Sequence, residues 1–179
     1  DDLIMRLRRQ TLPNIKIVLT GHGKVAMGSK EILDGMKIKQ VSIADYLTKK
    51  YSEPVYTQID TLDYNKRKDG KESSKQDFYQ NPQEYISDFE RFTKVSDVFL
   101  AGHFHGNESP DILTNEMLRA HDNKIQVVAD ISCDVAGPIA CTTKASTIAD
   151  PFFGYLPSEH KEVSYTHPAS IMVMSVDNL

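Results

Sequence analysis

Two glycines near the start of the chain stand in a pattern that can bind a pyrophosphate. The stretch Gly21-His22-Gly23-Lys24-Val25-Ala26 follows an apolar run at residues 15–20 and matches the dinucleotide-binding pattern, with Ala at the third small position. The first glycine permits a tight turn, and the second lets backbone approach a pyrophosphate. The third small residue lets helix and strand pack closely, and the helix N-terminus offers free N–H donors. These six residues therefore predict contacts with a dinucleotide.

A carboxylate that binds ribose is expected at the end of the second strand, about 20 residues after the glycines. Asp45 has this spacing and follows the apolar run at residues 40–43. A carboxylate there accepts hydrogen bonds from a ribose hydroxyl and repels a 2′-phosphate, which favours NAD(H). Lys49 and Lys50 nearby would instead attract that phosphate, so NADP(H) stays possible. A purely structural alternative is that Asp45 caps the segment that follows it.

Gly102 and His103 follow a third apolar run at residues 98–101. Ligands bind beyond the carboxyl ends of the strands in open α/β sheets, so we expect both residues near the coenzyme. His103 and His105 alternate, and two such side chains on a strand could both bind zinc. The local spacing offers no third ligand, and we predict no metal site.

Two acidic residues follow the apolar run that ends at residue 129. Asp130 is a candidate coenzyme contact, with capping of backbone N–H groups as its structural alternative. Asp134 lies beside the flexible stretch Ala136-Gly137-Pro138 and is predicted to face the nicotinamide or the substrate. Its structural alternative is a turn residue.

The scaffold that must position these residues is indicated by alternating apolar runs and helical patterns. A strand, a glycine turn, a helix and a second strand form a βαβ unit, which favours a parallel sheet with helices on its faces. The sequence therefore predicts an α/β fold, a Rossmann-like doubly wound parallel sheet. Strands are expected at residues 15–20, 40–43, 54–59, 98–101, 125–130, 163–165 and 171–176, and helices at 24–36, at 84–92 and after the N-cap Thr114.

Two segments are expected to lie outside this regular alternation. The polar stretch 60–82 contains Asp69-Gly70, a strong hairpin signal, and is predicted to be a surface insertion built around a hairpin. The stretch 134–157 is rich in Gly, Pro and Thr and is predicted to be a loop.

The composition limits the classes of function. A net charge of −4 over 179 residues gives no basic surface field for nucleic acid. No apolar stretch approaches the roughly 20 residues that cross a membrane, and two cysteines are too few for a disulfide framework. We therefore expect free thiols and a cytoplasmic protein. Both ends interrupt ordered patterns, which predicts that residues 1–179 are one dinucleotide-binding domain excised from a longer enzyme.

Four stretches resemble the alanine dehydrogenase and pyridine nucleotide transhydrogenase-like family. The resemblance is closest to its saccharopine dehydrogenase and lysine–oxoglutarate reductase branch. The stretches are Gly23-Lys24-Val25-Ala26-Met27-Gly28, residues 101–103 with 109–114, residues 130–134 through 147–153, and Val176-Asp177-Asn178-Leu179.

This resemblance implies two Rossmann-like domains with the active site between them, and this chain would be the coenzyme-binding one. It implies hydride transfer between NAD(H) and an amino-acid/oxo-acid pair, with the catalytic Lys and His in the other domain. Asp134 matches an acid beside the nicotinamide, and Asn178 matches an asparagine near the cleft. The chain alone would then be inactive, and the face left exposed could promote homo-oligomers. His103 and His105 replace residues that differ across the family, which leaves their role open, and the polar insertion departs from the simpler members.

Other classes of function stay open. One is a non-catalytic module that senses NAD(H). Another is an S-adenosylmethionine-dependent methyltransferase-like domain, whose sheet would end in a reversed strand. A zinc hydrolase that uses His103 and His105 is a more remote alternative.

Overall fold

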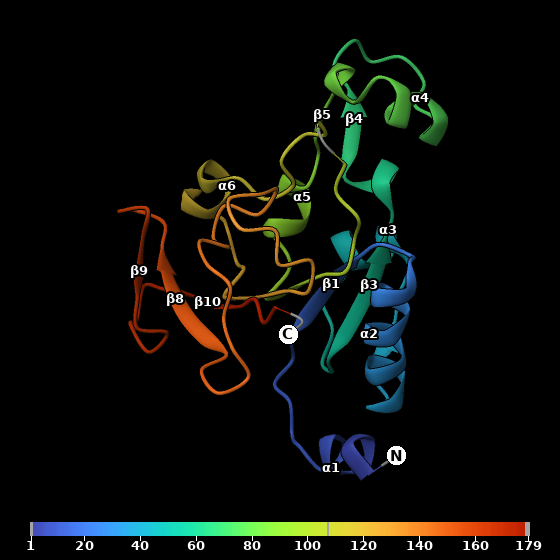
Figure 1. Cartoon of the computed structure of the whole chain (residues 1–179). Helices are drawn as coiled ribbons and strands as arrows, with labels where there is room; N and C mark the ends of the chain where they lie inside the picture. Colours follow the sequence, from blue (N-terminus) through green and yellow to red (C-terminus); the bar gives the residue numbers. More distant parts are fainter. Residues whose placement is uncertain (1, 107, 178–179) are drawn as a thin grey trace.

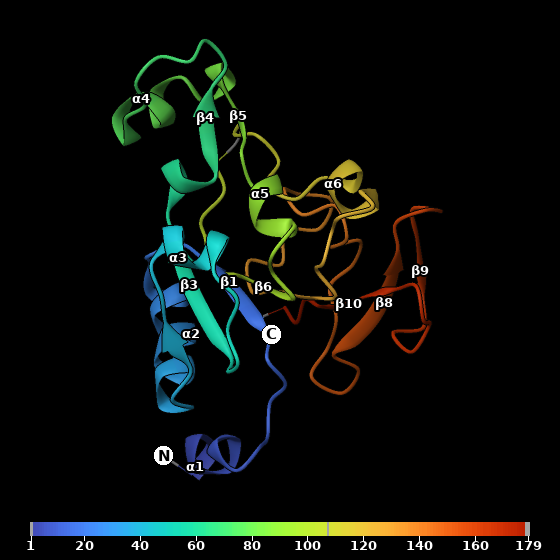
Figure 2. The ribbon, with the colours of Figure 1, turned by 180° about the vertical axis from the view of Figure 1, so that it is seen from behind.

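A central sheet of eight strands forms the body of the molecule, with helices on both of its faces (Figures 1 and 2). The structure is a computed structural model and describes residues 2–106 and 108–177. The strand order is β2-β3-β1-β6-β7-β10-β8-β9, and neighbours are parallel from β2 through to β10. β8 runs antiparallel to β10 and to β9. This architecture confirms the predicted α/β, Rossmann-like fold.

The sheet strands are β1 (Lys16–Thr20), β2 (Lys39–Gln40), β3 (Val55–Ile59), β6 (Val98–Ala101), β7 (Val127–Asp130), β8 (Phe152–Leu156), β9 (Lys161–Val163) and β10 (Ile171–Met174). The helices around it are α1 (Asp2–Arg8), α2 (Lys24–Gly35), α3 (Ile43–Thr48), α5 (Glu90–Thr93) and α6 (Asn115–Arg119). Between β3 and α5 the chain forms η1 (Thr61–Asp63), β4 (Asn65–Arg67), α4 (Lys75–Gln80), η2 (Pro82–Glu84) and β5 (Tyr85–Ser87).

Alternate side chains of β1 enter two different apolar clusters, as the period of a strand dictates. Ile17 and Leu19 pack with Leu33 of α2 on one face of the sheet. Val18 belongs to the cluster on the other face, which includes Phe92 of α5. β1 is thus buried on both sides, which is why its sequence is a nearly continuous apolar run.

The expectation that Asp45 ends the second strand is wrong. β2 stops at Gln40, and Ser42 begins helix α3 because its Oγ accepts the N–H of Asp45 at 3.2 Å. Asp45 therefore lies in the first turn of a helix, where its carboxylate pairs with Lys49 at 2.9 Å. The next strand along the chain that pairs with β1 is β3, which ends at Ile59.

The polar insertion projects from the end of the sheet at which β3 ends (Figure 1). β4 and β5 pair antiparallel, but Asp69-Gly70 does not join them in a tight hairpin, because α4 and η2 lie between the two strands. The predicted helix over 84–92 is also wrong in part. Tyr85 lies on β5, and α5 begins only at Glu90, although the aromatic residues pack in the core as expected.

The predictions for Thr114 and the cysteines are confirmed, whereas the prediction of a loop over 134–157 is wrong in part. Thr114 caps α6, with its Oγ1 accepting the Met117 N–H at 3.3 Å. β8 lies inside the stretch predicted to be a loop. Cys133 and Cys141 are free thiols, as expected.

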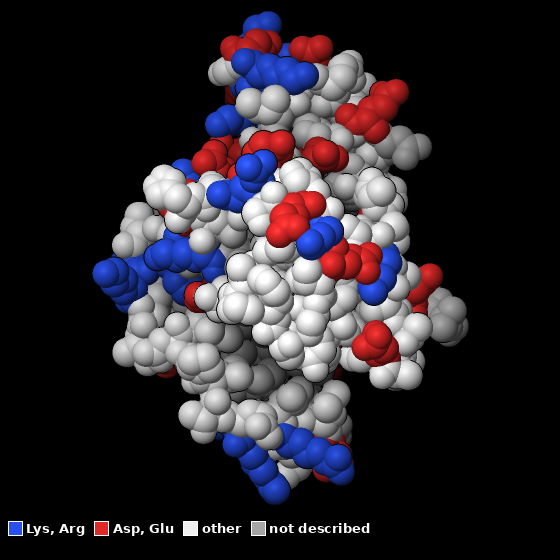
Figure 3. Space-filling model, turned by 90° about the vertical axis from the view of Figure 1, so that its left-hand side faces the viewer, with Lys and Arg blue, Asp and Glu red and all other residues white. Residues whose placement is uncertain are grey.

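Across the described residues no helix is long and apolar enough to cross a membrane. Acidic and basic side chains are interspersed on the face over β8 and β9 (Figure 3).

Candidate functional site

The turn between β1 and α2 depends on a glycine with a left-handed backbone. Gly21 has φ +96°, and its N–H donates to the carbonyl of Ile59 at 2.8 Å, which ties the turn to the end of β3. A Cβ at this position would lie 2.6 Å from the carbonyl oxygen of Gly102. The turn thus fits closely against both neighbouring strands.

Ala26 and Gly102 let the start of α2 approach the sheet. Ala26 is fully buried, and a Cβ on Gly102 would lie 3.0 Å from the Cα of Ala26. Gly23 has the opposite surroundings, because an added Cβ would have no heavy atom within 4 Å. Its backbone therefore faces open space at the beginning of the helix, where a ligand can approach the chain.

A cavity of about 620 Å³ opens around this turn. It lies at the carboxyl ends of β1, β3, β6 and β7, where open α/β sheets bind their ligands. Seven of the predicted site residues line it: Gly21, Gly23, Lys24, Val25, Gly102, His103 and Asp134. Three other predicted site residues do not line the cavity: Ala26 and Asp130 are buried, and Asp45 lies on α3. Asn178 lies outside the described residues.

Asp60 occupies the position that the sequence assigned to Asp45. It directly follows β3, the neighbour of β1, and it lines the cavity beside the glycine turn. One carboxylate oxygen accepts the N–H of Thr61 at 2.7 Å, and the other pairs with the ammonium of Lys75. Partial burial pushes the pKa of Asp60 upward, but these two partners outweigh burial and lower it. The carboxylate is therefore held in its charged form.

His103 presents a buried ring to the cavity. It is 7% exposed, and its Nδ1 lies 2.7 Å from the hydroxyl of Thr20 at the end of β1. Its Nε2 is buried and has no hydrogen-bond partner in the structure. Burial lowers the pKa of His103 to about 4, so the ring is neutral at pH 7. A neutral imidazole with one free nitrogen can donate to or accept from a bound ligand, depending on its tautomer.

His105 lies next to His103, with the ring centroids 6.5 Å apart. Burial also lowers the pKa of His105, against the opposing charges of Asp111 and Asp134. Within the described ranges no three His, Cys, Asp or Glu side chains gather closely enough to hold a metal ion.

Asp130 organises the loop after β7 from within the core. One of its oxygens accepts from the N–H groups of Ser132 and Cys133, both at 3.1 Å, and from the Ser132 hydroxyl at 2.6 Å. The other accepts from the hydroxyl of Thr142 at 2.6 Å. Its capping role is thus confirmed, and it holds in place the loop that carries Ser132 and Asp134 into the cavity.

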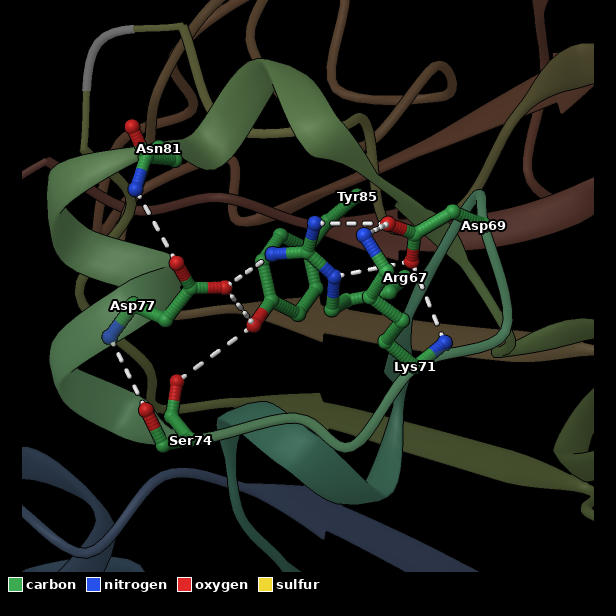
Figure 4. Close-up of polar contacts among 7 residues, drawn as sticks. All are labelled: Arg67, Asp69, Lys71, Ser74, Asp77, Asn81 and Tyr85. Carbon is green, nitrogen blue, oxygen red and sulfur yellow. Dashed lines mark hydrogen bonds and ion pairs between the residues drawn. The ribbon is translucent and has the colours of Figure 1, made fainter.

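The insertion supplies a wall of the cavity that the sequence did not reveal. Lys75 and Tyr79 of α4 line it together with Thr61 and Tyr64. Figure 4 shows how α4 is held: Arg67 of β4 reaches toward Asp77 on the helix. The sequence signal for Asp60 was an acid directly after an apolar run. Lys75 carried no such signal, since only tertiary structure brings it to the cavity.

No protein-family model matches this chain. The chain is 25% identical over 182 residues to an alpha-aminoadipic semialdehyde synthase of Arabidopsis thaliana, covering 90% of this chain and 17% of that protein. It is 23% identical over 204 residues to the mitochondrial alpha-aminoadipic semialdehyde synthase of Bos taurus, covering 99% of this chain and 22% of the bovine protein. The chain thus spans about a fifth of the length of these relatives. This distant similarity supports the broad family that the sequence resembles and does not separate its branches.

Proposed function

We propose that this chain is the coenzyme-binding part of a nicotinamide-dependent amino-acid dehydrogenase. The observation that carries the proposal is the joint position of Gly23 and Asp60 in one cavity, at the ends of neighbouring strands. A backbone open to a pyrophosphate and an acid one strand away form the two ends of a dinucleotide site. The distant relationship to alpha-aminoadipic semialdehyde synthases favours an amino-acid substrate for the whole protein.

The residues present fit such a coenzyme. The volume of the cavity lies within the range that small-molecule sites occupy. The start of α2 supplies N–H groups beside Gly23, and Lys24 adds a positive charge at the same place. The neutral ring of His103 lines the same cavity.

In this proposal the chain binds and orients, while the coenzyme when bound supplies the hydride chemistry. Asp60 accepts hydrogen bonds from ribose hydroxyls, and the glycine turn holds the pyrophosphate. Asp134, at the far side of the cavity, faces the nicotinamide and the amino-acid or oxo-acid substrate. The groups that exchange protons with the substrate belong to a second domain, so this chain alone binds coenzyme without measurable turnover.

The first test is a titration of the purified chain with NADH and with NADPH, followed by the fluorescence of the coenzyme. The chain contains no Trp, so energy transfer from Trp cannot contribute to the signal. We expect saturable binding of NADH. Asp60→Asn weakens it by about tenfold to a hundredfold, because a charged acceptor of a ribose hydroxyl contributes about 1.5 to 3 kcal/mol.

Asp45→Asn is the matched control for this titration, since it removes the same charge from an exposed ion pair on α3. We expect it to leave the affinity unchanged. If neither coenzyme binds the unmodified chain, or if Asp45→Asn weakens binding as much as Asp60→Asn, this assignment of the site is wrong.

A second candidate ligand is S-adenosylmethionine, and the reversed strand β8 near the end of the sheet favours it. A glycine turn followed by an acid after a neighbouring strand suits that ligand too. Competition between S-adenosylmethionine and NADH for the same chain separates the two functions. Preferential binding of S-adenosylmethionine would replace the dehydrogenase proposal.

A further inference from the structure

The polar insertion reaches the coenzyme cavity through two side chains of α4. Lys75 lines the cavity together with Asp60, and its ammonium pairs with the Asp60 carboxylate. Tyr79, one turn further along α4, lines the same wall. In the site proposed above, Asp60 lies at the ribose of the adenosine. Lys75 is therefore placed at the same end of the site.

A network of polar contacts fixes α4 in this position (Figure 4). The guanidinium of Arg67 bonds both oxygens of Asp69 at 2.9 Å and also pairs with Asp77 on α4. Asp77 further accepts from the hydroxyl of Tyr85 at 2.7 Å. The Oγ of Ser74 caps α4 by accepting the Asp77 N–H at 3.1 Å. Lys75 directly follows Ser74, so this network fixes the position of the Lys75 backbone, from which the side chain reaches Asp60.

The ion pair changes the charge that the ribose end presents to a ligand. Asp60 alone would repel a 2′-phosphate, which carries about −1.5 to −2 charges at pH 7. Lys75 cancels the charge of Asp60, and Lys24 lines the same cavity. The Lys75 side chain is 54% exposed, so it can turn from the carboxylate toward a phosphate without losing a packed position.

We propose that Lys75 is a specificity-determining residue of the coenzyme site, and that it allows this site to accept the 2′-phosphate of NADP(H). Asp60 still accepts a hydrogen bond from the ribose of NAD(H), since a carboxylate oxygen has room for more than one donor. The insertion is thus part of the binding site and sets the coenzyme choice. This inference rests on the proposed dinucleotide-binding function.

The experiment compares dissociation constants of NADH and NADPH for the unmodified chain, Lys75→Gln and Lys66→Gln. Lys66→Gln is the matched control, because Lys66 lies in the same insertion, is 57% exposed and pairs with Asp88 outside the cavity. We expect Lys75→Gln to weaken NADPH binding about tenfold or more, since the substitution removes the ammonium–phosphate contact and also leaves the Asp60 carboxylate unpaired beside the phosphate. NADH binding should change less than about threefold, and Lys66→Gln should affect neither coenzyme.

The outcomes separate the inference from the function on which it rests. If the unmodified chain binds neither coenzyme, the proposed function fails and this inference fails with it. Binding of NADH alone, or equal weakening of both coenzymes by Lys75→Gln, would leave the function standing and overturn the role of Lys75. A loss of NADPH affinity in Lys66→Gln as large as that in Lys75→Gln would also overturn it. Thermal melting of all three proteins checks that the substitutions leave the fold intact.

Discussion

The two glycines of the turn after β1 serve different purposes, and one pair of substitutions separates them. Gly21 has a left-handed backbone with φ +96°, whereas Gly23 has φ −75°, which any residue adopts. Gly21→Ala and Gly23→Ala add the same methyl group two residues apart. We expect the first to destabilise the fold and the second to weaken coenzyme binding.

The magnitudes follow from the surroundings of each added methyl. At Gly21 it would lie 2.6 Å from the carbonyl oxygen of Gly102 and 2.9 Å from the Cα of His103. Both are backbone atoms, so neither can rotate away, and the left-handed conformation alone costs about 1 to 3 kcal/mol. We expect Gly21→Ala to lose about 3 kcal/mol or more of unfolding free energy. At Gly23 the methyl meets nothing within 4 Å, and the change should stay within about 1 kcal/mol.

Urea unfolding followed by circular dichroism measures the first quantity, and NADH titration of each folded variant measures the second. Gly23→Ala should raise the dissociation constant about tenfold or more, because its methyl occupies the approach to the pyrophosphate. Gly23→Val enlarges the same obstacle and should raise it further. Equal destabilisation by the two alanine substitutions would refute the structural argument. Unchanged NADH affinity in both Gly23 variants would refute the placement of the pyrophosphate.

Two further predictions concern buried polar groups. His103 is neutral in the folded chain above a pKa of about 4 but is protonated in the unfolded chain below about pH 6.5, so its contribution to stability falls as the pH drops through this window. At pH 5 the unfolding free energy should be about 2 kcal/mol lower than at pH 7 because of this group. In His103→Gln, urea unfolding should show a difference between these two pH values that is smaller by that amount. An identical pH dependence in the variant would contradict the burial of the ring. Asp130→Asn replaces a carboxylate oxygen, which accepts hydrogen bonds, with an amide NH₂ that faces the same donors. We expect this variant to lose about 2 to 4 kcal/mol of unfolding free energy in urea unfolding. A loss under about 0.5 kcal/mol would show that these hydrogen bonds contribute little.

The sequence predicted the strand, glycine turn and helix of β1 and α2 because their signals are local. An apolar run, a glycine turn and an apolar helical spacing lie within 21 consecutive residues, 15–35, and β1 and α2 formed where expected. The prediction of a strand over 40–43 that leads to Asp45 is wrong, because a second local signal indicates a helix there. Ser42 stands three residues before Asp45, which is the spacing of an N-cap and its acidic partner. That pattern indicates a helix after residue 42, and the structure has α3 there.

Other differences come from pairings between distant residues. Tyr85, Phe89 and Phe92 have helical spacing and are buried, yet Tyr85 lies on a strand because β5 pairs with β4. The sequence predicts a loop where β8 lies. Gly154 of β8 approaches the chain at Ser164 so closely that an added Cβ would lie 2.5 Å from the Ser164 carbonyl oxygen. Glycine weakens the signal for a strand in the sequence, and inside a strand it often indicates a close approach of another backbone.

The position of Asp60 and of the insertion follows from the topology of the sheet. β3 and β6 lie on opposite sides of β1, so the chain must cross from one side of β1 to the other between residues 59 and 98. β3 ends at the carboxyl edge of the sheet, beside the glycine turn. Any segment inserted directly after β3 therefore starts at the ligand-binding edge and can cover the cavity. The length and polarity of the insertion are readable from the sequence, but its place over the site requires the strand order. For this reason a stretch that looks like a surface excursion becomes a wall of the cavity.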